Sequence, residues 1–199
     1  MPQASGLQFT ATIGEYSSDH FSVVGFALTE RLSELFQGRL DLASTDPSVV
    51  ASKVLEQPVD LVIWQDRAPL RRFTGVVSEF ARGDSGHRRT RYELVFRPPL
   101  WRLALMHNSR IFQNRGTDEI VDTVFDLERR LEEREYCVQH RESDLAFVER
   151  LAAEEGWHYR YQHGSLDGQE PPALVFADHH RDSPRLQAVP YNGKAGGST

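Results

Sequence analysis

Apolar and polar residues alternate along the first half of the chain. In residues 7–14 the apolar positions are Leu7, Phe9, Ala11 and Ile13, a period of two that is typical of a half-buried β-strand. Further segments between turn-forming residues are also expected to be strands: residues 21–30, 36–44, 59–64, 71–83 and 91–98. Several short strands separated by turns favour a closed or nearly closed antiparallel barrel.

Residues 46–55 interrupt this alternation. Asp46 suits the N-cap of a helix, and Pro47 suits its first turn. The three valines of the segment would then form a short apolar stripe. The pattern predicts one short helix within the strand-rich half.

The second half of the chain has a helical period. Residues 116–133 form an amphipathic pattern, with Thr117 as the expected N-cap and Asp118 and Glu119 at the positive end of the helix dipole. Residues 143–156 form a second such pattern. Its expected cap is Ser143 and its expected stop is Gly156. The apolar stripe of this second helix consists of Leu145, Val148, Leu151 and Ala152.

Period-two segments surround the second helix. Residues 134–140 are expected to form a strand between the two helices. Residues 157–163 place Trp157, Tyr159 and Tyr161 on one face, and residues 173–178 could pair with them across the intervening loop. The positions after this pair show no periodicity.

Composition limits the class of protein. At 199 residues and 39% apolar content, the chain can bury the core of one large or two small domains. It has no apolar run near the roughly 18 residues of a membrane helix, and its first residues lack the layout of a signal peptide. Its single cysteine fits a reducing compartment. We therefore expect a protein that does not use the usual export signal.

Charge is distributed unevenly within a formal net charge of −6. Residues 67–110 contain ten arginines against three acidic residues, whereas residues 117–156 contain thirteen acidic residues against five arginines. Both spans could be solvated faces, or they could meet within the chain or between copies of it. Nucleic acid is not an expected partner, because the chain as a whole is acidic.

Cys137 is the first candidate for chemistry, because His140 lies three positions after it. In a strand, however, alternate side chains point to opposite faces, so Cys137 and His140 would be separated. A lone free cysteine is also among the most commonly buried residues. Cys137 is therefore expected to be a core residue.

Histidines and paired carboxylates supply the other candidates. The stretch 178–182, together with His140, His158 and His163, offers metal-ligand types without a recognisable ligand spacing. Glu154 and Glu155 are expected to be exposed at a helix end. No phosphate-binding loop, nucleophile elbow or zinc-protease motif is present. The sequence predicts no catalytic residue, no metal, no cofactor, no small-molecule substrate and no enzyme activity.

Three stretches resemble the N-terminal region of VgrG, the spike protein family of bacterial type VI secretion systems. They are residues 92–125, 134–164 and 174–180, within a resemblance that covers about residues 7–190. It is densest at "LWRLALMHNSRIFQN" and "REYCVQHRESDLAFVERLAAEEG", which are long unbroken stretches.

The resemblance implies an α+β, mainly β fold similar to phage tail hubs. A tail-tube-like antiparallel β-barrel would occupy residues 1–105, a helical connecting segment residues 106–156, and the start of a second, incomplete β-barrel residues 157–199. The family forms a trimeric ring on the hexameric Hcp tube and supports a needle that punctures membranes. Effector cargo and a tip protein attach through later parts of the chain.

The resemblance also carries expectations about location and extent. The protein would assemble in the bacterial cytoplasm and leave through the type VI apparatus. Family members continue for several hundred residues beyond this segment, so the chain is expected to be a fragment or a shortened copy. A tail hub or baseplate protein of a contractile phage or pyocin is the alternative, and a cell-wall hydrolase segment is less favoured.

Overall fold

The structure is a computed structural model that describes residues 6–117, 119–121 and 133–177. Its largest unit is a six-stranded antiparallel sheet with the strand order β1-β4-β5-β6-β3-β2. The strands are β1 (Leu7–Ile13), β2 (Ser22–Thr29), β3 (Gln37–Ser44), β4 (Pro58–Gln65), β5 (Ala68–Ser85) and β6 (Thr90–Arg97). These are the six strands that the alternation predicts, with shifted ends.

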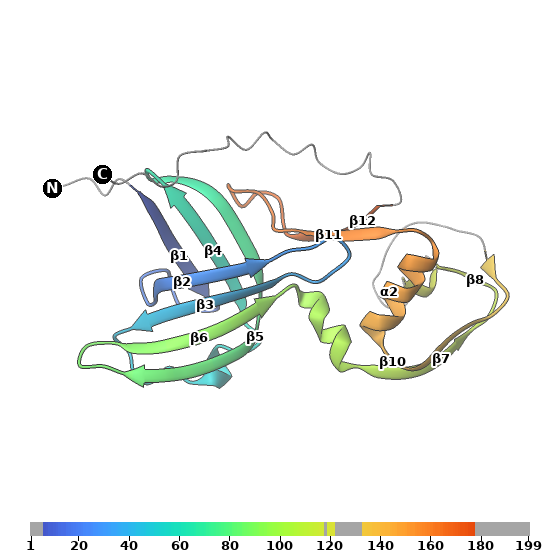
Figure 1. The fold of residues 1–199 in the computed structure, drawn as a ribbon, viewed down its shortest axis with the longest axis horizontal. Coiled ribbons are helices and arrows are strands. Elements are labelled where there is room, and N and C mark those ends of the chain that lie inside the picture. The colour runs from blue at the N-terminus through green and yellow to red at the C-terminus, as the bar shows by residue number, and fades with distance from the viewer. Residues whose placement is uncertain (1–5, 118, 122–132, 178–199) are drawn as a thin grey trace, which may run out of the picture.

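The sheet curls into a half-barrel, so that its edge strands β1 and β2 approach each other (Figure 1). Side chains rather than ladder hydrogen bonds join these edges: the rings of Phe9 and Phe26 lie 5.3 Å apart. A two-residue turn connects β4 to β5, with positive φ at both Asp66 and Arg67, the backbone that tight hairpins require. The expected antiparallel barrel is therefore confirmed as a curled half-barrel.

The concave face of this sheet holds the first hydrophobic core. Most of this core comes from the alternating pattern of the strands. In β3 and β6 the side chains that point inward are those at every second position of the sequence. Gly38 of β3 faces Phe96 of β6, and the ring of Phe96 occupies the space that a side chain at position 38 would need. The buried members are Ala11, Ile13, Phe21, Phe36, Leu40, Leu42, Val49, Val54, Val59, Leu61, Ile63, Phe73, Val77, Tyr92, Leu94 and Phe96.

The predicted helix over residues 46–55 is wrong. Only Ala51–Lys53 form a single 3₁₀ turn. Asp46 does not cap a helix; its Oδ1 accepts hydrogen bonds from the backbone N–H and the hydroxyl of Ser48, a local turn that competes with helix formation. Two of the three valines, Val49 and Val54, are nevertheless buried in the barrel core.

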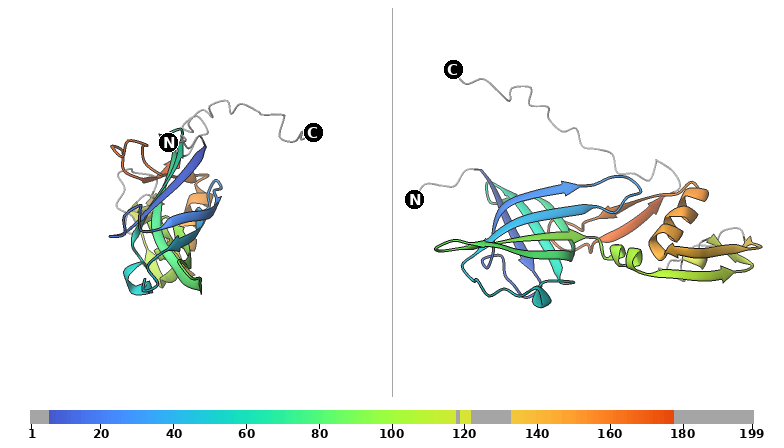
Figure 2. Two further views of the ribbon diagram at one scale, coloured as in Figure 1. Left: turned by 90° about the vertical axis from the view of Figure 1, so that its left-hand side faces the viewer. Right: turned by 60° about the horizontal axis from the view of Figure 1, so that its bottom comes forward.

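A second unit follows the barrel, and the 3₁₀ helix Pro99–Leu105 leads into it (Figures 1 and 2). Here β7 (His107–Phe112) pairs with β10 (Cys137–Ser143), and α2 (Asp144–Glu154) packs on the ribbon. The short strands β8 (Arg115–Gly116) and β9 (Glu133–Arg134) form a two-residue ladder. A hairpin of β11 (His158–Gln162) and β12 (Ala173–Ala177) returns toward the barrel, and its pairing confirms the sequence prediction.

The helical predictions have mixed outcomes. Ser143 caps α2 by accepting the N–H of Ala146, and Gly156 follows the helix with φ of +71°, so both ends are confirmed. Phe147 rather than Leu145 joins the buried face. Of the predicted helix 116–133, Thr117 and residues 119–121 are helical, and most of the rest lies outside the described residues.

The strand predicted over 134–140 divides into β9 and β10, with a bend at Glu135 and Tyr136 between them. Strand β7 carries no clear alternation in the sequence and was not predicted. Within the described ranges, no helix combines the length and the apolar character needed to cross a bilayer.

Replacing Gly38 by alanine tests the close packing of the barrel core. We expect Gly38→Ala to destabilise the chain by about 1–3 kcal/mol, because the added methyl group overlaps the Phe96 ring. Gly83→Ala is the matched control: the nearest atom to its new methyl group is the Cβ of Arg91 at 3.5 Å, an ordinary contact. Urea unfolding of both variants measures the difference, and equal stabilities would contradict this account of the core.

Candidate functional site: the junction between the two β units

The β11–β12 hairpin attaches the second unit to the rim of the barrel. The backbone N–H of Ser33, in the turn between β2 and β3, donates to the carbonyl oxygen of Tyr159 at 2.9 Å. Burial and the hydrogen bond to Glu149 raise the pKa of Tyr159, so its phenol stays protonated and donates to that carboxylate at 2.5 Å. Tyr159 thereby links α2 to the barrel.

His163 lies at the centre of this junction, directly after β11. Its side chain is 10% exposed. The backbone N–H of Thr74 donates to Nδ1 at 3.0 Å, the Thr74 carbonyl oxygen lies 3.2 Å from the same nitrogen, and Nε2 lies 2.9 Å from Oε1 of Glu30. The Thr74 hydroxyl donates to the His163 carbonyl at 3.0 Å. Rings of Phe36, Phe73 and Tyr161 surround the imidazole.

Arg72 fastens the loop that follows His163. Its Nε and Nη2 donate to the two carboxylate oxygens of Asp60 at 2.9 and 2.6 Å, a bidentate pair that fixes the guanidinium plane. Its Nη1 then donates to the carbonyl oxygen of Ser165 at 3.2 Å. A side chain at Gly168 would meet the same Nη1 at 2.9 Å, so the loop approaches Arg72 closely. The loop between β11 and β12 is therefore held by a group from the barrel wall.

A buried acidic residue organises the other side of the second unit. The side chain of Asp144 is 4% exposed and accepts hydrogen bonds from the amides of Asn108 and Gln139 at 2.8 and 2.7 Å. Arg110 lies 3.4 Å from its Oδ2. These partners come from β7 and β10, so one carboxylate ties the ribbon to the first turn of α2. Arg110 and Asp144 also join the arginine-rich and acidic spans of the sequence within one chain.

Glu154 and Glu155 are exposed at the end of α2, as expected, and both are also held in ion pairs. Arg134 donates to Glu154 at 2.6 Å and to Glu155 at 2.5 Å, and the Thr117 hydroxyl donates to Glu155 at 2.6 Å. The bonds from Arg134 lower the pKa of both carboxyl groups. A general acid needs a raised pKa, so the lowered pKa values disfavour that role for either carboxyl group. The ion pairs with Arg134 instead hold β9 against α2.

The prediction for Cys137 is confirmed. Cys137 points into the second hydrophobic core and is 5% exposed, whereas His140 is exposed on the opposite face of β10. Burial raises the pKa of the thiol, which disfavours the thiolate that a nucleophile needs. The second core consists of Phe112, Ile120, Val121, Cys137, Phe147, Val148 and Leu151.

The histidines considered as metal ligands lie in different places. His163 is engaged at the junction, His140 is exposed on the ribbon, and His158 lies on β11. The stretch 178–182 lies outside the described residues. Among the residues that the structure describes, no group of three or more histidine, cysteine or acidic side chains could hold a metal ion.

Only weak signals in the sequence point to the residues that hold the junction and the ribbon. His163 could have been recognised by its place at the end of an aromatic strand, just before Gly164. Asp144 occupies the first turn of a helix, where an acidic residue is ordinarily exposed and dipole-stabilised. Neither pattern reveals a partner from a distant strand.

Comparison with known proteins identifies this arrangement. The family model of the phage tail baseplate hub (GPD) matches residues 29–199. The chain belongs to this hub family. Its curled barrel and the attached second unit therefore represent the hub fold, and the junction described above lies between them.

Two curated relatives of this hub chain are type VI secretion system spike proteins. VgrG3 of Vibrio cholerae is 36% identical over 96% of this chain and 20% of its own length. VgrG2b of Pseudomonas aeruginosa is 43% identical over 78% of this chain and 16% of its own length. The resemblance to VgrG is thus confirmed across most of the chain, which spans a fifth or less of the length of these relatives.

A solved structure shares the fold of this hub chain. The c3393 protein of E. coli is described as a component of the type VI secretion system with structural similarity to the T4 bacteriophage tail proteins gp27 and gp5. It superposes with a TM-score of 0.71 at 24% identity, over 92% of this chain and 49% of that protein.

Removal of the Asp144 carboxylate tests the ribbon–helix network. We expect Asp144→Ala to cost about 2–4 kcal/mol of unfolding free energy, because it leaves two amides and a guanidinium without their shared acceptor. Asp84→Ala, on an exposed hairpin, should change stability by no more than about 0.5 kcal/mol. Denaturant unfolding of the two variants measures both changes in unfolding free energy. A loss for Asp144→Ala as small as the loss for Asp84→Ala would refute the role given to the Asp144 carboxylate.

The junction should weaken in acid. His163 and, less strongly, Arg71 hold the pKa of Glu30 below its usual 4.5. The ionised carboxylate therefore stabilises the fold above pH 4.5, and this contribution is lost as pH falls through the lowered pKa. Because Glu30 is 38% exposed, solvent screening limits the contribution to about 1 kcal/mol or less.

Comparison of the wild type with Glu30→Gln isolates this contribution. The stability difference between the two proteins should be present at pH 7 and shrink as the pH falls below 4.5. Glu15→Gln, at an exposed position, is the control for a general loss of charge. A difference that stays constant across this pH range would show that the Glu30–His163 pair does not stabilise the junction.

Proposed function

We propose that this chain is the hub segment of a type VI secretion spike. The observation that carries the proposal is its 36% identity to a VgrG spike over 96% of its length. The fold supports it, because a hub must hold two β units in a fixed relation, and the junction at His163 does so with directional hydrogen bonds. In this role the chain is a structural part of an injection device.

The proposed domain division has three parts, the first barrel and two parts of the second β unit. Residues 1–105 form the first tube-like barrel, residues 106–156 the connecting segment, and residues 157–199 the start of a second barrel. The ribbon and α2 of the connecting segment carry their own core. The β11–β12 hairpin would contribute the first strands of the second barrel.

The proposed partners are those of the spike as a whole. Three copies would form a ring on the hexameric Hcp tube, while effector cargo and a tip protein would bind through other parts of the spike. Assembly would take place in the bacterial cytoplasm, followed by secretion through the apparatus. No catalytic step belongs to this segment, a view supported by the ion-paired state of Glu154 and Glu155 and the buried Cys137 thiol.

A hub of a contractile phage or pyocin tail is the second candidate, favoured by the description of the matching family. The two candidates share the fold and differ in the surrounding machine. Genes for a tube, a sheath and a recycling ATPase beside this one would favour secretion. Genes for capsid proteins would favour a phage.

Light scattering of the chain, alone and mixed with its tube protein, tests the proposed role. We expect a complex with the tube ring whose mass fits one hub trimer on one hexamer. Bovine serum albumin in place of the tube protein controls for non-specific association. The proposed function would be disproved by two results together: this chain does not bind the tube protein, and the complete spike protein does not form trimers.

A further inference from the structure

His163 has one carboxylate within contact distance among the residues that the structure describes. Its Nε2 lies 2.9 Å from Oε1 of Glu30, and its Nδ1 lies within hydrogen-bond distance of both the backbone N–H and the backbone C=O of Thr74. Aromatic rings pack around the imidazole, and the side chain is 10% exposed. When the imidazole carries two protons, Glu30 is therefore the group that balances its charge.

The other acidic side chains on the elements around the ring are bonded elsewhere or exposed. The bonded pairs are Asp60 with Arg72, Glu34 with Arg31, Asp167 with Ser165 and Glu149 with Tyr159. Glu170, in the loop after His163, is exposed. Burial raises the pKa of the Tyr161 phenol beside the imidazole, so this group stays neutral in acid. Within the described ranges, no second carboxylate is thus in place to replace Glu30.

Positive charge gathers beside the same carboxylate. Arg71 lies 4.0 Å from Oε2 of Glu30, and its guanidinium is 5.0 Å from the centre of the Phe73 ring, which also contacts His163. Arg160 lines the same cavity as Glu30, and its Nη1 is buried without a hydrogen-bond partner among the described residues. Loss of the Glu30 charge would leave cations at the junction with no anion between them, and a buried charge without its partner is costly.

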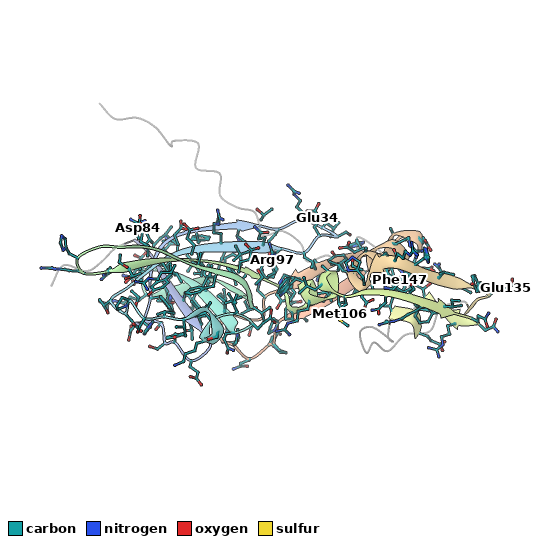
Figure 3. The ribbon with its side chains drawn as sticks, turned by 90° about the horizontal axis from the view of Figure 1, so that it is seen from below. Glu34, Asp84, Arg97, Met106, Glu135 and Phe147 are labelled. Atoms are coloured by element: carbon teal, nitrogen blue, oxygen red, sulfur yellow. The ribbon has the colours of Figure 1, made fainter. Side chains whose placement is uncertain are left out.

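Solvent reaches Glu30 while the junction is closed. A cavity of about 290 Å³ lies beside the pair, and Glu30, Phe36 and Tyr161 are among the residues that line it. Glu34 belongs to the same lining and lies at the waist between the barrel and the second unit (Figure 3). The Glu30 side chain is 38% exposed. Glu30 can therefore take up a proton before the junction opens, whereas the imidazole behind it stays buried.

We propose that His163 and Glu30 form a proton-sensitive latch, which releases the β11–β12 hairpin from the barrel rim in acid while the barrel stays folded. The latch is closed while Glu30 is ionised, in either charge state of the imidazole, because Nδ1 can accept the N–H of Thr74 or donate to its C=O. Protonation of Glu30 leaves the imidazolium buried and unbalanced. Release of the hairpin returns that charge to water, which favours the open state.

The barrel does not need the hairpin for its core. Every buried member of the barrel core lies between Ala11 and Phe96, and Tyr161 packs on this cluster only from its edge. The hairpin can therefore leave the rim without emptying the core. The latch belongs to this chain alone, so it stands apart from the proposed spike function.

The direction of the pH effect follows from Glu30. In the closed state, the hydrogen bond from His163 and the charges of His163 and Arg71 hold the pKa of Glu30 below its usual 4.5. In the open state these contacts are gone and the usual value returns. Opening thus takes up a proton as the pH falls from 4.5 through the lowered pKa, so acid favours the open state.

Hydrogen exchange of single backbone amides, followed by NMR and corrected for the intrinsic effect of pH, tests the latch. The amides of Ser33 and Thr74 are the reporters, because each donates a hydrogen bond across the junction. The amide of Val77 is the control, since it donates to the Gln57 carbonyl oxygen within the barrel. Between about pH 5.5 and 3.5 we expect the opening of Ser33 and Thr74 to rise about fivefold, with Val77 unchanged.

Two variants assign the sensing group. Glu30→Gln keeps a hydrogen-bond acceptor and removes the charge, so the imidazole takes up its second proton without a carboxylate beside it. The coupling between the two groups is reciprocal, so a rise of similar size should now occur near pH 6.5, the usual imidazole range. Glu34→Gln is the matched control in the same turn, because Glu34 pairs with Arg31. Its opening should begin at the wild-type pH.

Three outcomes would overturn the latch. If Val77 gains exchange together with Ser33 and Thr74, acid unfolds the whole chain and does not open the junction selectively. If the junction amides show no dependence on pH, protons on the pair do not control docking. If Glu30→Gln keeps the wild-type onset, or Glu34→Gln moves it, another group senses the proton. Each of these results leaves the proposed spike function standing.

Discussion

Placement of His163 between the barrel and the second unit is the constraint on which the rest of the structure depends. The imidazole accepts a backbone N–H from β5 and reaches a carboxylate that follows β2, while aromatic rings from both units pack around it. Each of these contacts is short and directional, so the second unit has one orientation on the barrel rim. Hydrophobic contact alone would allow sliding, because it has no preferred direction.

Charged side chains fix the position of other elements in the same way, through short directional contacts. Arg72 fixes the loop after His163, Asp144 fixes α2 on its ribbon, and Arg134 fixes β9 on α2. In each case one side chain joins elements that are distant in sequence. These bonds resist a change of shape, since separating them exposes partly buried charge without its partner.

The sequence predicted the barrel well and the junction poorly, for physical reasons. Alternation along β3 and β6 reflects burial on one face, which is a local property, so these strands and their inward residues could be predicted. Asp46 was misread as a helix cap because capping and local turns use the same side-chain acceptor. His163 and Asp144 find their partners on strands 89 and 36 positions away, and no local pattern encodes such pairings.

Strand β5 connects the junction to the far end of the molecule without a break. It contributes Arg72 and Thr74 at one end and Arg82 near the other, and it pairs with β4 over residues 68–76 and with β6 over residues 76–85. Ladder hydrogen bonds lie perpendicular to the strands, so a push along β5 shears many of them together and cannot open them one by one. A force applied along β5 at its hairpin with β6 would thus reach the second unit through one stiff, continuous strand.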